Sequence, residues 1–443
     1  MTRKRLIKGL AFVLIFAVLF AAVSKILVSS DDYRNYQWIA GFYEEPEDSL
    51  DAVYIGSSTG YAYWNSLVAW DRYGIAVYPY TNNSQHFITV EYLIKEVRKT
   101  QPNALFIVNT NSIDDDKLTV EDFHYLLDNM PFSLNKLQLT NHMVKTAGMD
   151  WEEALELYVP MYRYHDRWSK VNVEDFINPI NGLKGASDYD NYFKTVLNIA
   201  DAYTYSDGQK PLPDYISDAA VGLMDYCEKE NVKILFVTVP RVESEDRIDQ
   251  LNTLNAMLEE RGFDTLNLLK QPQLCDLDLT QDYYNNGHTN IHGSIKYTNF
   301  LSAYLIEHYG FTNKHGEEAY ASWDAGWEKY AKQLHQNILE LELNTSLRTT
   351  KLEAPENLTV SASGSTVSLS WSPVEGAKGY ELYRKLNKSQ WEYIGVTAEH
   401  VFEDTLEKAI EKCAYTVVPF MEAGDRTFYG KFPYKGVKLE TQS

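Results

Sequence analysis

The stretch Ala52-Val53-Tyr54-Ile55-Gly56-Ser57-Ser58 decides the fold of this chain and points to its chemistry. Four apolar residues, of the kind buried in parallel sheets, run into a glycine turn that carries a serine hydroxyl. Far downstream, Asn285-Asn286-Gly287-His288-Thr289-Asn290 opens an amphipathic helix. A serine and a histidine from opposite ends of one domain outline a nucleophile and its general base.

The pattern of residues 33–312 predicts one α/β domain. Short apolar runs alternate with helical patterns, and these segments are 52–55, 90–98, 104–109, 215–230, 232–240 and 247–261. This alternation predicts a parallel sheet with helices on both faces, and ligands bind at the strand-end loops of such sheets. The Tyr-rich stretch of about 118–209 is expected to be an irregular insertion that serves as a lid or lies on the substrate side.

Residues 1–30 predict a membrane anchor. The basic cluster Arg3-Lys4-Arg5 precedes a run over 6–28 that is apolar except for Lys8, Ser24 and Lys25. Its uninterrupted part, 9–23, approaches the roughly 20 residues needed to span a bilayer when it is extended to Val28. Basic residues before the run and Asp31-Asp32 after it keep the N-terminus cytoplasmic and place the rest outside. An uncleaved signal anchor is preferred over a signal peptide cleaved near Ser24.

The sequence changes character after Phe311. A charged helical stretch over 313–350 is expected to pack or to act as a spacer between domains. Residues 354–440 then show alternating strands separated by turns, as in a β-sandwich. The order of Trp371-Ser-Pro373, Gly379-Tyr380-Glu-Leu-Tyr383-Arg384 and Tyr415-Thr-Val resembles a fibronectin type III module. Such modules are adhesive or spacing units, and the resemblance implies no catalytic role.

Composition excludes several classes of function. The formal net charge of −21 disfavours binding to nucleic-acid phosphates, which needs clustered Lys and Arg. Three widely spaced cysteines without a C-x-x-C motif indicate burial rather than a zinc site or a disulfide framework. His288 and His292 are four residues apart but lack a third ligand, so no metal and no cofactor are expected.

Both end blocks of the α/β domain resemble those of the SGNH (GDSL-like) hydrolases. Val53-Tyr54-Ile55-Gly56-Ser57-Ser58 resembles the first block, especially in the membrane-anchored bacterial branch that has Gly-Ser-Ser in place of Gly-Asp-Ser. The segment 285–290, followed by Gly293, resembles the last block, which is Asp-x-x-His in the family. The resemblance spans roughly 51–309 and implies a flavodoxin-like three-layer fold, with Ser58 as nucleophile and His288 as base.

Three departures from the family pattern bear on activity. Asn285 stands where the family has Asp; its carbonyl oxygen can accept from the imidazole, but an amide brings no charge and can favour the wrong tautomer. The second block, 80–85, has no glycine, so an N–H from the Asn82-Asn83 loop is the expected oxyanion donor there. The third-block amide is either Asn109 or Asn111, and Asn111 is preferred because it is nearer the loop, where a side chain can reach the site. Asp282 is a weaker candidate than Asn285 for orienting the histidine.

Taken together, the sequence predicts an extracytoplasmic, membrane-anchored esterase or O-acyltransferase that acts on acyl groups of a cell-envelope polysaccharide through a Ser–His acyl-enzyme. Its expected partners are that polysaccharide, membrane lipid around the N-terminal helix, and an acyl-exporting membrane protein. The alternative is a catalytically weak or inactive protein that keeps the fold as a binding or assembly platform. Asn285 and the missing glycine favour the alternative, whereas the retained Ser58 and His288 favour the enzyme.

Overall fold

The computed structural model of the chain describes residues 3–28, 33–113, 118–171, 173–177, 180, 182–187, 205–278, 281–349, 352–387, 391–406, 412–423, 426–430 and 432–439. The chain divides into two compact units, Met1–Leu334 and His335–Ser443. Each unit is described by itself.

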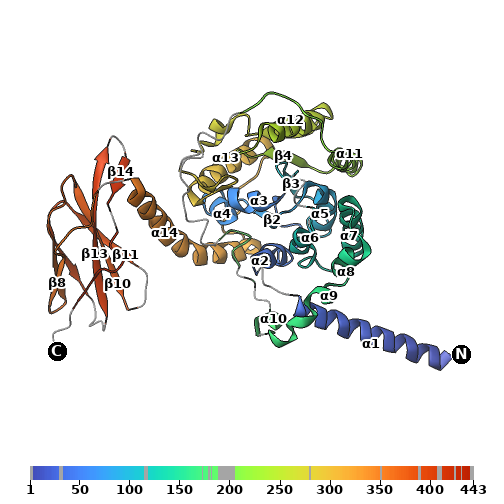
Figure 1. Cartoon of the computed structure of the whole chain (residues 1–443), viewed down its shortest axis with the longest axis horizontal. Helices are drawn as coiled ribbons and strands as arrows, with labels where there is room; N and C mark the ends of the chain where they lie inside the picture. The colour runs from blue at the N-terminus through green and yellow to red at the C-terminus, as the bar shows by residue number, and fades with distance from the viewer. Residues whose placement is uncertain are drawn as a thin grey trace. The chain divides into compact units, whose positions relative to one another are not determined.

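A parallel sheet of five strands forms the centre of the first unit (Figure 1). Its strands are β1 (Ala52–Gly56), β2 (Val77–Thr81), β3 (Leu105–Asn109), β4 (Ile234–Thr238) and β5 (Asp264–Asn267). Their order is β2-β1-β3-β4-β5, the order of flavodoxin-like doubly wound sheets. Every residue of β1 to β4 is buried, which explains their near-continuous apolar sequences. The direction of winding reverses between β1 and β3, and ligands bind at the carboxyl ends of the strands at such a switch point.

Helices cover both faces of the sheet, as the sequence predicts. Helices α4 (Ser66–Tyr73) and α13 (Ile291–Tyr309) lie on one face, whereas α5 (Val90–Val97) and α11 (Asp214–Lys229) lie on the other (Figure 1). On the α13 face, Tyr54 and Ile107 from the strands pack in one buried cluster with Tyr297 and Leu301 from the helix. The other elements of the sheet region are α2 (Tyr33–Phe42), α3 (Ser58–Tyr63), η1 (Phe87–Thr89), α12 (Glu245–Glu260), η6 (Pro272–Cys275), β6 (Tyr283–Asn285) and β7 (His288–Thr289).

The stretch expected to be irregular is largely helical in its described part. It contains α6 (Val120–Leu127), α7 (Leu134–Ala147), α8 (Trp151–Tyr158), α9 (Pro160–Tyr164), η3 (His165–Ser169) and α10 (Val173–Ile177). Helices α6, α7 and α8 each begin at a polar N-cap residue. The side chains of Thr119, Ser133 and Asp150 each accept a backbone N–H of the first turn. The prediction of an irregular structure was wrong for these residues, because it was based on the high tyrosine content and not on the capping residues that begin the helices. Residues 188–204 of the insertion lie outside the described part.

Helix α1 (Arg3–Leu27) contains the apolar N-terminal run. Its segment Ile7–Leu27 has a mean hydropathy of 2.7, and only 6% of its most apolar window is buried by the rest of the protein. The segment is long and apolar enough for a signal anchor or a membrane span.

The stretch predicted as a linker belongs partly to the first unit. After η7 (Glu318–Tyr320), helix α14 (Ala321–Thr349) begins with side chains that pack on the α/β unit. Trp323 Nε1 donates to a carboxylate oxygen of Glu45 at 3.0 Å, and the Tyr330 hydroxyl donates to the Ser187 carbonyl at 3.1 Å. The buried side chains of Trp323, Tyr330 and Leu334 therefore pack this part of α14 against the first unit.

The second unit is an antiparallel β-sandwich. Its strands are β8 (Thr359–Ser363), β9 (Thr366–Ser370), β10 (Gly379–Leu386), β11 (Glu392–Thr397), β12 (Val401–Thr405), β13 (Cys413–Ala423), β14 (Arg426–Tyr429) and β15 (Val437–Lys438). One sheet has the order β12-β9-β8; the other has the order β11-β10-β13-β14, with β15 paired to β13. Trp371, Tyr380 and Tyr415 share its buried core. The quoted segments Gly379-Tyr380-Glu-Leu-Tyr383-Arg384 and Tyr415-Thr-Val lie in β10 and β13.

Candidate active site

Ser58 lies at the switch point of the sheet. Strand β1 ends at Gly56, Ser57 caps α3 in an extended conformation, and Ser58 is the first residue of that helix. Gly56 is needed at this position, because a Cβ atom there would lie 2.9 Å from the Cβ of Asn109 on the neighbouring strand. The close approach of β1 and β3 therefore places the half-buried Ser58 over the carboxyl ends of the two strands.

A short hairpin brings His288 to the same place. Strands β6 and β7 pair through the turn 285–288, in which the Asn285 side-chain oxygen accepts the Gly287 N–H at 2.9 Å. Thr289 then donates its hydroxyl to the Ala62 carbonyl at 2.6 Å, which fastens the hairpin to α3. This contact joins the segment that carries His288 to the helix that begins with Ser58.

Ser58, His288 and Asn285 form a continuous hydrogen-bonded row. Ser58 Oγ lies 2.6 Å from His288 Nε2, and His288 Nδ1 lies 2.8 Å from Asn285 Oδ1. The Gly287 N–H fixes which end of the Asn285 amide faces the ring, since only the carbonyl oxygen can accept it. The ring therefore carries its hydrogen on Nδ1, and Nε2 is left to accept the serine proton. This arrangement suits a general base acting on a serine nucleophile.

This geometry changes the expectation for Asn285. The sequence raised the concern that an amide would favour the wrong histidine tautomer, but the turn holds the amide in the orientation that selects the competent one. What Asn285 lacks relative to a carboxylate is the negative charge. The side chain is also exposed to solvent.

Buried tyrosines support the hairpin. Tyr63 and Tyr283 both donate their hydroxyls to the Pro240 carbonyl, each at 2.6 Å. Burial raises the pKa of both phenols well above the usual value, so both remain protonated donors. The Tyr284 ring stacks on His288 with centroids 5.4 Å apart, which limits the orientation of the imidazole.

The side chains of Asn83 and Asn111 both have hydrogen-bond partners; at Asn83 the expected oxyanion donor is a backbone N–H of the 82–83 loop, on which the side-chain contact does not bear. Asn83 Oδ1 accepts the Tyr61 hydroxyl at 2.6 Å. Asn111 binds the backbone of Val239 at both ends of its amide, accepting its N–H at 2.8 Å and donating to its carbonyl at 3.1 Å, and it also contacts Glu243. The Asn111 amide thus joins the loops after β3 and β4, and it is Asn109 that lies beside Gly56.

Four buried polar atoms at or just after the carboxyl ends of β2 and β3, the strands that flank β1, have no hydrogen-bond partner among the described residues. They are Thr81 Oγ1, Asn82 Oδ1, Gln85 Nε2 and Asn109 Nδ2. Thr81 and Asn109 end the strands on either side of β1. Because buried polar atoms are nearly always hydrogen-bonded, this set indicates that the site accommodates water or a polar ligand group. Sequence reasoning left Asn109 as the second choice and assigned no role to Gln85.

Asp282 and His292 have structural contacts close to the site. Asp282 accepts from Lys296 Nζ at 2.8 Å and from the Asp278 N–H at 2.7 Å. Burial lowers the pKa of His292, so its ring is neutral near pH 7. Gly293 of the family-like block lets α13 approach the Asp282 backbone, since a Cβ atom there would lie 2.3 Å from the Asp282 carbonyl oxygen.

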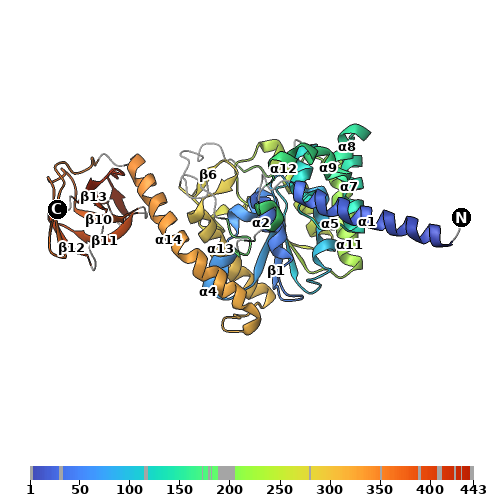
Figure 2. The same cartoon turned by 90° about the horizontal axis from the view of Figure 1, so that it is seen from below.

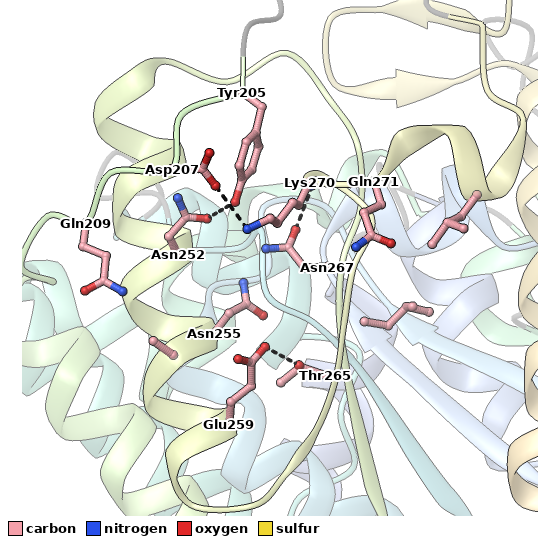
Figure 3. A pocket seen from close by; sticks show the side chains of 13 residues that line it. Tyr205, Asp207, Gln209, Asn252, Asn255, Glu259, Thr265, Asn267, Lys270 and Gln271 are labelled. Carbon is pink, nitrogen blue, oxygen red and sulfur yellow. Dashed lines mark hydrogen bonds and ion pairs between the residues drawn. The ribbon is translucent and has the colours of Figure 1, made fainter.

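A separate polar pocket of about 480 Å³ lies at the β5 edge of the sheet (Figure 3). Its labelled lining consists mainly of amide and charged side chains around one aromatic ring: Tyr205, Asp207, Gln209, Asn252, Asn255, Glu259, Thr265, Asn267, Lys270 and Gln271. Tyr205 donates to Asn252 at 2.7 Å, and Lys270 Nζ lies 3.1 Å from Asp207. Asn267 ends β5, so this part of the pocket lies at the same carboxyl edge of the sheet as Ser58.

Comparisons with known proteins gave short or distant matches. The family model described as GH85 endohexosaminidases, C-terminal domain, matches residues 349–412. A search of curated proteins gave no match.

Solved structures gave matches with low identity and low TM-scores. An Fn3-like protein from Clostridium thermocellum is 18% identical with a TM-score of 0.17, and the match covers 20% of this chain and 91% of that one. The protein FN3tt is 25% identical with a TM-score of 0.17, over 20% of this chain and 91% of that one. A proposed acylhydrolase from Bacteroides fragilis is 9% identical with a TM-score of 0.31, over 61% of this chain and 95% of that one.

Proposed function

We propose that the chain is a membrane-anchored SGNH-like serine esterase or O-acyltransferase that acts on acyl groups of cell-envelope polysaccharide. The observation that carries this proposal is the row Ser58 Oγ, His288 Nε2, His288 Nδ1 and Asn285 Oδ1, with distances of 2.6 and 2.8 Å. It is the arrangement needed for one proton to move while an acyl group is transferred.

The proposed reaction has two halves. Ser58 Oγ attacks the carbonyl carbon of an ester while its proton passes to His288 Nε2. The tetrahedral intermediate then expels the alcohol oxygen, which takes that proton, and leaves an acyl group on Ser58. Water or a polysaccharide hydroxyl attacks the acyl-serine, gives its proton to Nε2 and releases the product, after which Ser58 recovers the proton. The Ser58 N–H and Asn109 Nδ2 are the proposed donors to the oxyanion, in place of Asn111.

The choice of a polysaccharide rests on the polar character of the surroundings. The serine and histidine are only half-buried, so a polymer can reach them from solvent. The pocket at β5 presents amides, carboxylates and the Tyr205 ring, groups that hydrogen-bond to sugar hydroxyls and stack on sugar rings. Neighbouring strands lie about 4.8 Å apart, so β1 and β5, three positions apart, are separated by roughly 15 Å. A polymer of a few sugar units would span that distance.

The second candidate is a binding or assembly platform without turnover. The neutral, exposed Asn285 favours it, because no carboxylate stabilises the imidazolium that forms during catalysis.

A serine-directed probe tests the enzyme proposal. We expect a fluorophosphonate to label the full-length protein in detergent at Ser58, because His288 Nε2 activates that hydroxyl. Peptide mass spectrometry identifies the labelled serine. Ser57→Ala is the matched control and should still be labelled, since the Ser57 hydroxyl bonds to Thr59 rather than to the imidazole. Failure of Ser58 to react, with the fold intact, would favour the platform.

Removal of the pocket's aromatic ring tests the polysaccharide substrate. Tyr205→Ala should raise KM for an acetylated oligosaccharide by a few-fold to about 10-fold, as expected for the loss of roughly 1 kcal/mol of stacking. Turnover of a small activated acetyl ester, which does not reach the pocket, should stay unchanged. Tyr393→Ala, at an exposed tyrosine of the β-sandwich, is the control. Equal loss on both substrates would contradict a role in glycan binding.

A further inference from the structure

The end of α1 is bound by a buried arginine from the helical insertion. Arg167 Nη1 donates to the Leu27 carbonyl at 2.7 Å, and Nη2 donates to Asp175 at 3.2 Å. A guanidinium satisfies the unpaired carbonyls at a helix C-terminus and matches the negative end of the helix dipole. Because the Arg167 and Asp175 side chains are buried, the C-terminus of α1 is held against η3 and α10.

The elements around this contact expose large apolar side chains. Tyr162 on α9, Trp168 on η3, and Val173 and Phe176 on α10 are 57%, 75%, 70% and 65% exposed. We call these four residues the juxtamembrane patch. Figure 1 shows α9 and α10 beside the C-terminal end of α1, in agreement with their contacts to that helix. Figure 2 shows α9 near the same end of α1 in the perpendicular view. Large apolar residues exposed on elements that contact one end of the same helix indicate an interaction surface.

The position and the charge of the patch favour a lipid surface as its partner. The apolar segment of α1 ends at Leu27, so the patch lies at the level where a spanning α1 would leave the hydrocarbon. Tyr and Trp side chains are favoured at that depth. Residues 160–177 carry three basic and three acidic side chains, for a net charge of zero, whereas the whole chain carries −21. The segment is thus not repelled by a lipid surface as the rest of the chain would be.

We propose that the juxtamembrane patch inserts into the headgroup region of the bilayer that α1 crosses. The lipid surface is its partner, and the contact is apolar rather than electrostatic. The α/β unit then has two attachments to the membrane, α1 and the patch, and together they limit how far the unit can tilt relative to the bilayer. This inference rests on α1 as a span and is independent of the chemistry at Ser58.

Probes placed on the patch test the proposal in the full chain. Trp168→Cys and Phe176→Cys are labelled with nitrobenzoxadiazole, and each protein is reconstituted into phosphatidylcholine–phosphatidylglycerol vesicles. Because all three native cysteines are buried, the label goes to the introduced one. We expect blue-shifted emission and quenching by lipids that carry a nitroxide near the headgroup, and high salt should not reverse either effect. Ile306→Cys, at an exposed position of α13, is the control and should report water.

A second variant distinguishes contact of the patch with lipid from burial of the patch by a protein. With the probe at position 176, Tyr162→Ser, Trp168→Ser and Val173→Ser together should abolish quenching by nitroxide lipid and expose the probe to aqueous iodide. Water-like probes at 168 and 176 would overturn the proposal. So would probes shielded from iodide but not quenched by lipid, because a protein would then cover the patch. Protease protection of the N-terminus reports insertion of α1, and failure of that insertion would overturn the proposal as well.

Discussion

Replacement of Ser58 by alanine is expected to lower turnover of a small activated acetyl ester by at least about 10³-fold, and His288→Ala should do the same. The 2.6 Å contact between Ser58 Oγ and His288 Nε2 makes the two side chains one catalytic unit. The double variant should therefore be no slower than either single variant. The measurement is kcat/KM for the full chain in detergent.

Ser57→Ala is the matched control for this experiment. It removes a neighbouring hydroxyl that bonds to Thr59 at 3.2 Å, so its rate should stay close to that of the parent protein. Independent, additive losses from Ser58→Ala and His288→Ala would contradict the shared proton transfer. Equal rates for parent and Ser58→Ala would exclude the acyl-enzyme.

Introduction of a carboxylate at position 285 is expected to raise kcat/KM by about 10- to 100-fold, because a hydrogen bond to a charged group contributes roughly 1.5–3 kcal/mol. Asn285 Oδ1 already accepts from His288 Nδ1 at 2.8 Å and from the Gly287 N–H at 2.9 Å. Asn285→Asp can keep both contacts, and it adds the charge that stabilises the imidazolium. The gain should be smaller than the ~10⁴ of the serine-protease comparison, because the tautomer is already fixed here.

Asn286→Asp is the control that adds a negative charge without a hydrogen bond to His288 Nδ1. It adds the same charge one residue further along the turn, where the backbone carbonyl accepts the Val242 N–H. A similar gain from Asn286→Asp would show that local charge, rather than the bond to Nδ1, raises the rate. Asn285→Ala should lower the rate, since the ring loses its orienting acceptor.

The sequence identified the central strands of the sheet but not its edges. β1, β3 and β4 are buried along their whole length and carry continuous apolar runs, which pattern analysis detects. β2 contains Pro79, and β5 has the polar sequence Asp-Thr-Leu-Asn with partial exposure. Both are edge strands, where proline and polar residues are tolerated, so the signal for a strand is weak.

The hydrogen-bonded row of Ser58, His288 and Asn285 depends on two local motifs, whereas the position of the third-block amide depends on how neighbouring strands pair. Ser58, His288 and Asn285 lie in two short segments whose order and spacing are visible in the sequence. The choice between Asn109 and Asn111 depends on the register of β3 against β1 and on the Val239 backbone that binds Asn111. Distance along the chain favoured Asn111, whereas pairing in the sheet brings Asn109 beside Gly56.

The 230-residue separation of Ser58 and His288 also sets when the proposed catalytic pair can assemble. The serine emerges early during synthesis, but its base arrives only with the β6–β7 hairpin, near the end of the α/β unit. Contacts between segments so distant along the chain form late, after the intervening polypeptide is available to close the loop. Under the proposed function, a chain that is still crossing the membrane would therefore carry an inert serine, and the proposed acyl chemistry would begin only on the far side.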